Sequence, residues 1–379
     1  MRPKGDNESV KTLRLMVDPR RMETAQAQAA LEQAAEILRA GGLVALPTET
    51  VYGLGANALD AAAVGRIFLA KQRPVWDPVI VHVAGDHGAE AMLAGLVKEV
   101  PEAARKLMAA FWPGPLTLLL PRTAAVPDAV TAGRPLVGVR MPAHPVALEL
   151  IRRAGVPVAA PSANLFGHTS PTTAAHVLED LDGRIDAVLD AGPTEHGVES
   201  TVLDPCQNPM VIYRPGAVTS VQIRDTAGAV NLFREDGALE ARPRAALPSP
   251  GVGLRHYAPR ARLVLLESER AGVTLAVGEA GELGARLAGA VLGEAGERVG
   301  VMLPSGVAAP AGSAVYDWGR WTAPEELARR LYAGLRALDA EGCTVILCPL
   351  PRAGGIGAAI RDRLRKAANL KTGDEETES

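Results

Sequence analysis

Short apolar segments that end in clusters of hydrogen-bonding residues recur along the first half of the chain and limit the folds open to it. The run at 43–46 is ended by Pro47, and Thr48, Glu49 and Thr50 follow. Alternation of such runs with helical periodicity is typical of an α/β fold. We therefore predict a mixed sheet of about seven strands. The predicted helices include 22–39, 60–71 and 101–111, and the predicted strands are 43–46, 78–83, 116–120, 136–140, 157–160, 187–190, 200–203 and 210–213.

The length of 379 residues and a change of texture near residue 234 indicate two domains. Residues 22–233 form the first predicted domain. Residues 234–261 carry charges, prolines and glycines with little periodicity, so we interpret them as a long linker, which is usually functional or disordered. A second α/β domain is predicted over 262–370, before an acidic tail at 371–379. Its predicted strands are 262–266, 299–303 and 344–347, and its predicted helices are 324–340 and 358–368.

Charge and cysteine content exclude several classes of protein. The net charge of -3 gives no global basic field for coating nucleic acid. Cys206, Cys343 and Cys348 lack the paired spacing of a disulfide framework or a zinc site. The first residues are polar, and no run of about 18 apolar residues exists. We therefore expect no signal peptide and no membrane span, and we predict a cytoplasmic protein.

Polar residues gather where the predicted strands end, which is where ligands bind in open α/β sheets. Taken singly, each cluster is also what a turn needs to satisfy its backbone, and a strand histidine is more often a core residue. Three arginines, one lysine, one histidine and many hydroxyls in five such places favour a pocket for an anionic ligand. The cations and histidine are Lys71, Arg73, His82, Arg140 and Arg214.

Several familiar chemistries have no motif in the sequence. It lacks GxxxxGK[ST], HExxH, GxSxG and a His/Cys cluster, so no protein-held metal is predicted. The glycines of "AGGIGAAIRDRL", from Ala353, have no acidic residue downstream at dinucleotide spacing, and we interpret them as a helix start. Ser162 and Ser200 have no local base for covalent catalysis.

Many motifs in one order make the chain resemble the threonylcarbamoyl-AMP synthase family, in its long form with a C-terminal domain. The resemblance covers nearly the whole sequence. It implies a YrdC-like domain, which is an open twisted mixed sheet with a concave positive face, and a smaller Rossmann-like α/β domain after the linker. The matching segments are "PTETVYGLG", "AKQRPVWDPVIVHV", "FWPGPLTLLL", "VRMPAHP", "APSAN", "SPTTAAHV", "GVESTVLD", "YRPGAVT", "SPGVGLRHYAP" and "GIGAAIRDRLRKAAN".

The resemblance implies a reaction and a set of partners. The family condenses L-threonine, bicarbonate and ATP into threonylcarbamoyl-adenylate and releases pyrophosphate. A separate transferase complex then passes the threonylcarbamoyl group to tRNA. Magnesium is expected to be bound through the triphosphate. The linker is expected to fold over the nucleotide and shield the labile carbamate from water.

The resemblance also implies roles for individual residues. Arg140 would bind the carboxylate of threonine, while Thr50, His82 and Ser200 would orient its hydroxyl and amine. The expected catalytic set is Lys71, Arg73, Ser162 and Asn164. The expected threonine site is Thr50, His82, Arg140, Ala160 and Ser200. The expected ATP contacts are Arg73, Asp77, Leu136, Ser162, Ser170, Arg214 and Tyr257.

Two positions depart from the family pattern in ways that bear on ATP. Gln72 stands where glycine is usual, and Asp77 where asparagine is usual. A carboxylate near the triphosphate either ligates magnesium or weakens ATP binding, and the sequence leaves both alternatives open. The linker also lacks the bulkier and more basic run that is common at Val252, Gly253 and Leu254.

Two other functions remain open at the level of sequence. One is a carbamoyltransferase of related fold, although its usual acylphosphatase and zinc segments are not visible. The other is a module that binds double-stranded RNA weakly on a local basic face. Pyrophosphate release with ATP, bicarbonate and threonine, measured with each omitted in turn, separates the three.

Overall fold

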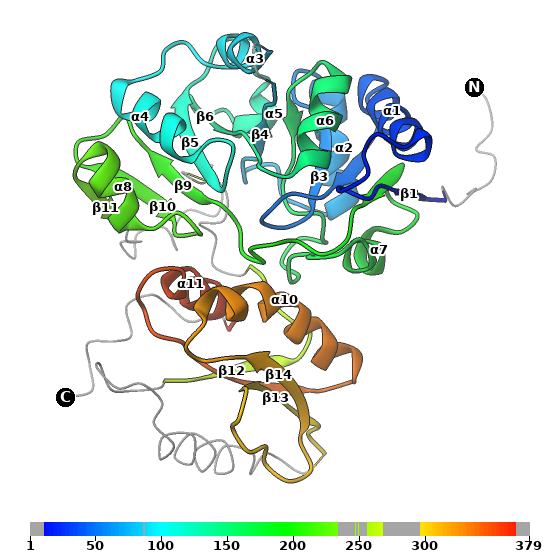
Figure 1. The fold of residues 1–379 in the computed structure, drawn as a ribbon, viewed down its shortest axis with the longest axis vertical. Coiled ribbons are helices and arrows are strands. Elements are labelled where there is room, and N and C mark those ends of the chain that lie inside the picture. The colour runs from blue at the N-terminus through cyan, green and yellow to red at the C-terminus, as the bar shows by residue number, and fades with distance from the viewer. Residues whose placement is uncertain are drawn as a thin grey trace.

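The computed structural model describes residues 11–85, 88–233, 247, 249, 256–267 and 296–368, which form two sheets with their helices (Figure 1). Within these residues no helix has the length and apolar character needed to cross a membrane. Most of the predicted linker at 234–261 and all of the tail at 371–379 lie outside the described residues.

The large sheet confirms the predicted mixed α/β fold, with eleven described strands where about seven were expected. Their order is β1-β8-β2-β3-β7-β4-β6-β5-β9-β10-β11, and neighbours pair in both directions. The strands are β1 Leu13–Met16, β2 Val44–Leu46, β3 Gly53–Asn57, β4 Ile80–His82, β5 Leu116–Pro121, β6 Leu136–Arg140, β7 Val158–Ala159, β8 Ala187–Asp190, β9 Thr201–Asp204, β10 Met210–Arg214 and β11 Val230–Leu232.

Two of the strands that the sequence did not predict, β1 and β3, have weak strand signals. β1 exposes Leu13 and Met16 by 42% and 49%, so it lacks an apolar buried face, yet it pairs in parallel with β8. It lies before residue 22, where the first domain was predicted to begin. β3 reads GLGAN, and its two glycines hide a fully paired strand between β2 and β7.

The ends of α2 in the first domain are set by a capping side chain and by a left-handed residue. Asp60 caps α2 as the sequence predicts, since its side chain accepts from the amides of Ala62 and Ala63. The helix ends at Lys71, and Gln72 takes the left-handed conformation, with φ at 53°, that usually favours glycine. The helices are α1 Ala25–Arg39, α2 Ala61–Lys71, α3 Gly88–Leu96, α4 Glu102–Phe111, α5 Asp128–Thr131, α6 Pro145–Ala154, α7 Ala174–Leu181 and α8 Ser220–Ala227.

The second domain is a four-stranded parallel sheet in the order β12-β15-β13-β14. Its Rossmann-like character stays a prediction. Figure 1 shows α10 and α11 lying between this sheet and the first domain. The elements are β12 Arg262–Leu266, β13 Val299–Pro304, β14 Ala314–Gly319, β15 Val345–Pro349, α10 Pro324–Ala340 and α11 Gly357–Ala367.

The loop before β9 contacts α10 so closely that a glycine is required. At Gly197 φ is +72°, and an added Cβ would lie 2.4 Å from the carbonyl oxygen of Ala328 in α10. Arg329 of the same helix donates from Nε to the carbonyl of Glu195. The two domains therefore meet backbone to backbone beside this loop.

Gly197→Ala should loosen this contact, and Gly192→Ala is its matched control. Both glycines have positive φ, but a Cβ at Gly192 meets nothing within 4 Å. Each change should lower the free energy of unfolding by about 1–2 kcal/mol for the left-handed backbone. Gly197→Ala should lose about 1–3 kcal/mol more through the clash with α10. Urea unfolding measures both, and equal losses would show that the interdomain contact is not tight.

Candidate functional site

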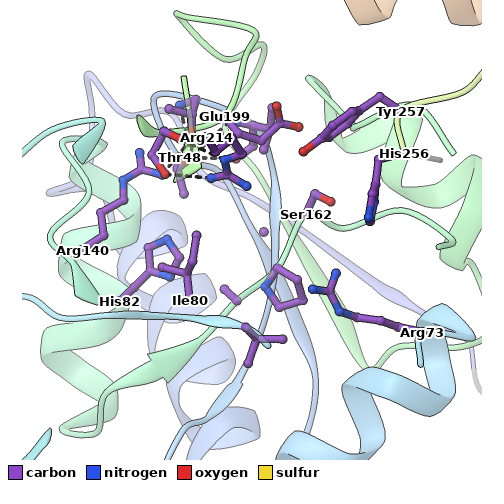
Figure 2. Close-up of a pocket in the computed structure, with 17 residues that line it drawn as sticks. Thr48, Arg73, Ile80, His82, Arg140, Ser162, Glu199, Arg214, His256 and Tyr257 are labelled. Atoms are coloured by element: carbon purple, nitrogen blue, oxygen red, sulfur yellow. Dashed lines mark hydrogen bonds between the residues drawn. The ribbon is translucent and has the colours of Figure 1, made fainter. Parts of the chain in front are cut away.

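A pocket opens at the strand ends of the large sheet, and His256 and Tyr257 close one side of it (Figure 2). Its volume of about 60 Å³ is far below that typical of a pocket for a drug-sized ligand. The lining residues are Thr48, Thr50, Val51, Gly53, Arg73, Val79, Ile80, His82, Arg140, Ala160, Pro161, Ser162, Glu199, Ser200, Arg214, His256 and Tyr257.

Parallel pairing of β4 with β6 places His82 and Arg140 side by side, because the two residues are register partners. Arg140 is 3% exposed and donates to the hydroxyl of Thr50 at 3.0 Å and to the carbonyl of Gly114 at 3.1 Å. Its Nη2 lies 2.5 Å from Oε1 of Glu49. Burial alone would raise the pKa of Glu49, but the charge and hydrogen bond of Arg140 hold it below its usual value. Arg140 is thus a fixed cation on one wall.

His82 lies at the end of β4 with its ring in the pocket wall (Figure 2). It is 3% exposed, and its Nδ1 has no hydrogen-bond partner among the described residues. Burial, reinforced by the charge of Arg140, lowers the pKa of His82 to about 3. The imidazole is therefore neutral at ordinary pH, and its Nδ1 is a buried atom that is unpaired among the described residues.

Ser200 and Arg214 form a second polar wall at the ends of β9 and β10. Arg214 donates from Nη2 to the hydroxyl of Ser200 at 3.1 Å and from Nε to the carbonyl of Ser200 at 3.1 Å. The same hydroxyl is 2.8 Å from that of Thr117 on β5. Three strands thus fix the orientation of the Ser200 hydroxyl.

Lys71 is buried and does not line the pocket. Its Nζ donates to the carbonyl oxygens of Ser162 and Asn164, at 2.5 Å each. Burial, with the neighbouring charge of Arg73, pulls the pKa of Lys71 well below its usual value. The side chain of Asn164 donates to the carbonyls of Leu165 and His168. Of the four expected catalytic residues, only Arg73 and Ser162 line the cavity. Lys71 and Asn164 instead shape the loop that carries Ser162.

Arg73 reaches the pocket from the turn after α2 and rests on Asp77. Its Nη2 lies 2.9 Å from Oδ1 of Asp77 and donates to the carbonyl of Pro78 at 2.7 Å. The guanidinium carbon also lies 6.0 Å from the ring centre of Phe166. Asp77 is fully buried, and burial raises its pKa despite the charges of Arg73, Lys71 and Arg214. Its carboxylate supports the arginine instead of facing the cavity.

The other residues expected to contact ATP differ in whether they line the cavity. Tyr257 lines the pocket. Ser170 lies behind it, where its hydroxyl donates to Oε1 of Glu199 at 2.5 Å. Leu136 is the first residue of β6, at the opposite end of the strand from Arg140, and it lies outside the cavity lining. Of the expected residues the lining omits five in all: Lys71, Asp77, Leu136, Asn164 and Ser170.

In the part of the chain that the structure describes, no three His, Cys, Asp or Glu side chains lie close enough together to hold a metal ion. Asp77, the one carboxylate that the sequence offered for magnesium, is paired with Arg73. The described residues therefore offer no cage for a metal ion of their own.

Four polar or charged residues are among the pocket and support residues that the predicted site lacked: Thr48, Glu49, Glu199 and His256. Glu49 and Glu199 stand inside motifs that the sequence analysis quoted, but nothing local shows that each carboxylate meets an arginine far away in sequence. Thr48 accepts from the amide of Val51 and so shapes the turn that presents Thr50. His256 is next to the predicted Tyr257, and this adjacency was the one signal that pointed to it.

Comparison with protein families finds two families along the chain, and the second match begins before the last strand of the large sheet. A family described as "Telomere recombination" matches residues 36–216. A second family, described as "Threonylcarbamoyl-AMP synthase, C-terminal domain", matches residues 218–369. Together they span most of the sequence.

Whole proteins resemble the chain over nearly their full length. The threonylcarbamoyl-AMP synthase of Pyrococcus abyssi is 43% identical, with 89% of this chain and 94% of that protein aligned. That of Bacillus subtilis is 42% identical, with 89% and 92% aligned. The crystal structure of Pyrococcus abyssi Sua5 complexed with L-threonine has a TM-score of 0.82 and 39% identity, and it covers 95% of this chain and 99% of its own.

The low pKa of His82 should make stability depend on pH. An unfolded histidine gains its proton near a pH of about 6.5, whereas folded His82 gains it near 3. The contribution of neutral His82 is therefore complete above pH 6.5 and is lost as the pH falls. Between pH 7 and 5 the free energy of unfolding should fall by about 2 kcal/mol more in the wild type than in His82→Asn. Urea titrations at both pH values test this, and parallel losses would contradict it.

Proposed function

The chain belongs to the threonylcarbamoyl-AMP synthase family, and we propose that the pocket between Arg73, Arg140 and Arg214 is its site of synthesis. The enzyme is an adenylyl-type transferase that makes L-threonylcarbamoyl-adenylate from L-threonine and ATP for tRNA modification. Bicarbonate would supply the carbamoyl carbon, and pyrophosphate would leave.

The observation that carries this proposal is the pairing of His82 and Arg140 on adjacent strand ends. An arginine fork suits a carboxylate, so the carboxylate of threonine would bind at Arg140. Thr50 and Ser200, which are already oriented by hydrogen bonds, would meet its hydroxyl or amine. The unpartnered Nδ1 of His82 provides a further polar contact in this wall. Ala160 would complete the subsite through its backbone.

ATP would bind on the opposite side, against Arg73, Ser162 and Arg214. Both arginines are held by other groups before ligand arrives, Arg73 by Asp77 and Arg214 by Ser200. Preorganised cations of this kind stabilise the charge that develops at the α-phosphate without having to reorient. Tyr257 would contact the nucleotide where the linker rejoins the described chain.

The chemistry needs no covalent enzyme intermediate. The unprotonated amine of threonine attacks carbon dioxide, or bicarbonate with loss of water, and forms an N–C bond and a carbamate. A carbamate oxygen then attacks the α-phosphorus, and the bond to pyrophosphate breaks. A pKa near 3 makes His82 a weak base, so we assign it to orienting the amine and leave the proton to water.

Magnesium would enter with the triphosphate, whose oxygens would hold it. When bound, it offsets phosphate charge. The chain would contribute by placing Arg73 and Arg214 beside the same phosphates. A separate transferase would consume the product, and the cytoplasmic location and weak RNA binding remain predictions.

Omission of single substrates tests the function. Pyrophosphate release should require ATP, bicarbonate and L-threonine together. Release without threonine would favour a carbamoyltransferase, and no release under any condition would favour a binding module.

Arg140→Lys tests the threonine subsite. Lysine keeps a positive charge beside Glu49, which alanine would leave buried and unpaired. Loss of the fork should raise the KM for threonine about 10- to 100-fold and leave the KM for ATP within about twofold. Exposed Arg66, paired with Asp186, provides the control Arg66→Lys, which should change neither constant. Equal rises in both KM values for Arg140→Lys would refute the assignment.

A further inference from the structure

We propose that Arg363 and Tyr332 of the C-terminal domain are positioning residues for the synthesis site, and that they act through Glu199. The proposal rests on the proposed function, since it names what holds two walls of the same pocket. It gives the second domain a direct part in synthesis, because α10 and α11 carry these two side chains.

Arg363 crosses from α11 into the first domain and is completely buried. Its Nε lies 2.6 Å from Oε2 of Glu199. Its Nη2 donates to the carbonyl oxygen of Pro215 at 2.9 Å. Its guanidinium carbon lies 5.1 Å from the ring centre of Tyr257. One side chain thus contacts the residues on either side of the β9–β10 pair and the segment at Tyr257.

Each of these three segments carries a pocket residue. Glu199 lines the cavity itself and precedes Ser200, whose hydroxyl is bound by Arg214. Pro215 directly follows Arg214. Tyr257 forms part of the wall opposite Arg140 (Figure 2). A shift of Arg363 would therefore move the proposed ATP side of the site at Arg214 and Tyr257, and would also move Glu199 beside Ser200.

Tyr332 of α10 reaches the same carboxylate. Its hydroxyl lies 3.0 Å from Oε2 and 3.1 Å from Oε1 of Glu199. Ser170 donates to Oε1 from the first domain. Burial alone would raise the pKa of Glu199, but the charges of Arg363 and Arg214 and the hydrogen bonds from Ser170 and Arg363 hold it below its usual value. The carboxylate is therefore charged and anchored from both domains.

Stability alone is a weak explanation for this arrangement. A buried ion pair often contributes no more than apolar side chains of similar volume would, because both charges lose their hydration. Its directional contacts instead fix where each partner lies. Asp362 and Lys366 of α11 form a second ion pair beside the buried Arg363, so this end of α11 is rich in partly buried charge.

Two conservative variants of the full chain test the inference, each with a matched control. Arg363→Lys keeps the charge and loses the fork, and Arg361→Lys changes the same helix where the arginine contacts Glu267 and Pro351 within the second domain. Tyr332→Phe removes only a hydroxyl, and Tyr316→Phe does so beside Arg330, away from the pocket. Steady-state kinetics with ATP and with threonine varied, and the thermal midpoint, are measured for all four.

Arg363→Lys should lower kcat/KM for ATP about 100-fold, as expected when a reacting group is misplaced. Tyr332→Phe should lower it about tenfold, through loss of a hydrogen bond to a charged group. In both variants the KM for ATP should rise more than the KM for threonine, because Pro215 and Tyr257 belong to the ATP side. Both controls should match the wild type.

A change in the KM for ATP that exceeds the change in the KM for threonine separates a positioning role from a loss of stability. Partial unfolding reduces the active concentration and lowers kcat, but it leaves both KM values unchanged. Unchanged KM for ATP in the variants would overturn the proposal. Should Arg363→Lys be unfolded at the assay temperature, Tyr332→Phe decides by the same criterion. Failure of the wild type to need threonine would instead refute the proposed function.

Discussion

Buried carboxylates that each hold one arginine are the interactions on which the pocket depends. Glu49 lies against Arg140, and Asp77 lies against Arg73. Glu199 holds Arg363, which reaches it from the second domain. An arginine fork removed from water needs a counter-charge of fixed geometry. These pairs therefore determine where the cations point before any substrate arrives.

The pairs also set the balance of charge that a ligand would meet. Without the acids the clustered cations would repel one another, and Glu49 and Asp77 reduce that repulsion. Arg214 is held by the hydroxyl and carbonyl of Ser200, so it keeps its charge for a ligand. The ammonium group of Lys71 donates to the carbonyls of Ser162 and Asn164, so Lys71 supports the loop and does not face a ligand. Structural and ligand-binding cations thus lie side by side.

Sequence reasoning placed candidate site residues at the strand ends, and the structure shows which of them lie together. Polar residues at strand ends led to His82 and Arg140, and register pairing of β4 with β6 brings these two together. The same reasoning could not tell a lining residue from a supporting one, and so it placed Lys71 and Asp77 in the cavity. Their roles depend on distances between segments about 90 residues apart or on burial, which no local pattern records.

A crystal structure of the chain with L-threonine and a non-hydrolysable ATP analogue would test the central claim most directly. The account predicts the threonine carboxylate at the guanidinium of Arg140, the phosphates beside Arg73 and Arg214, and the three carboxylate–arginine pairs intact. Substrates bound elsewhere, or an Arg140 that swings away from Glu49 to meet its ligand, would contradict a pocket that is fixed in advance by its buried acids.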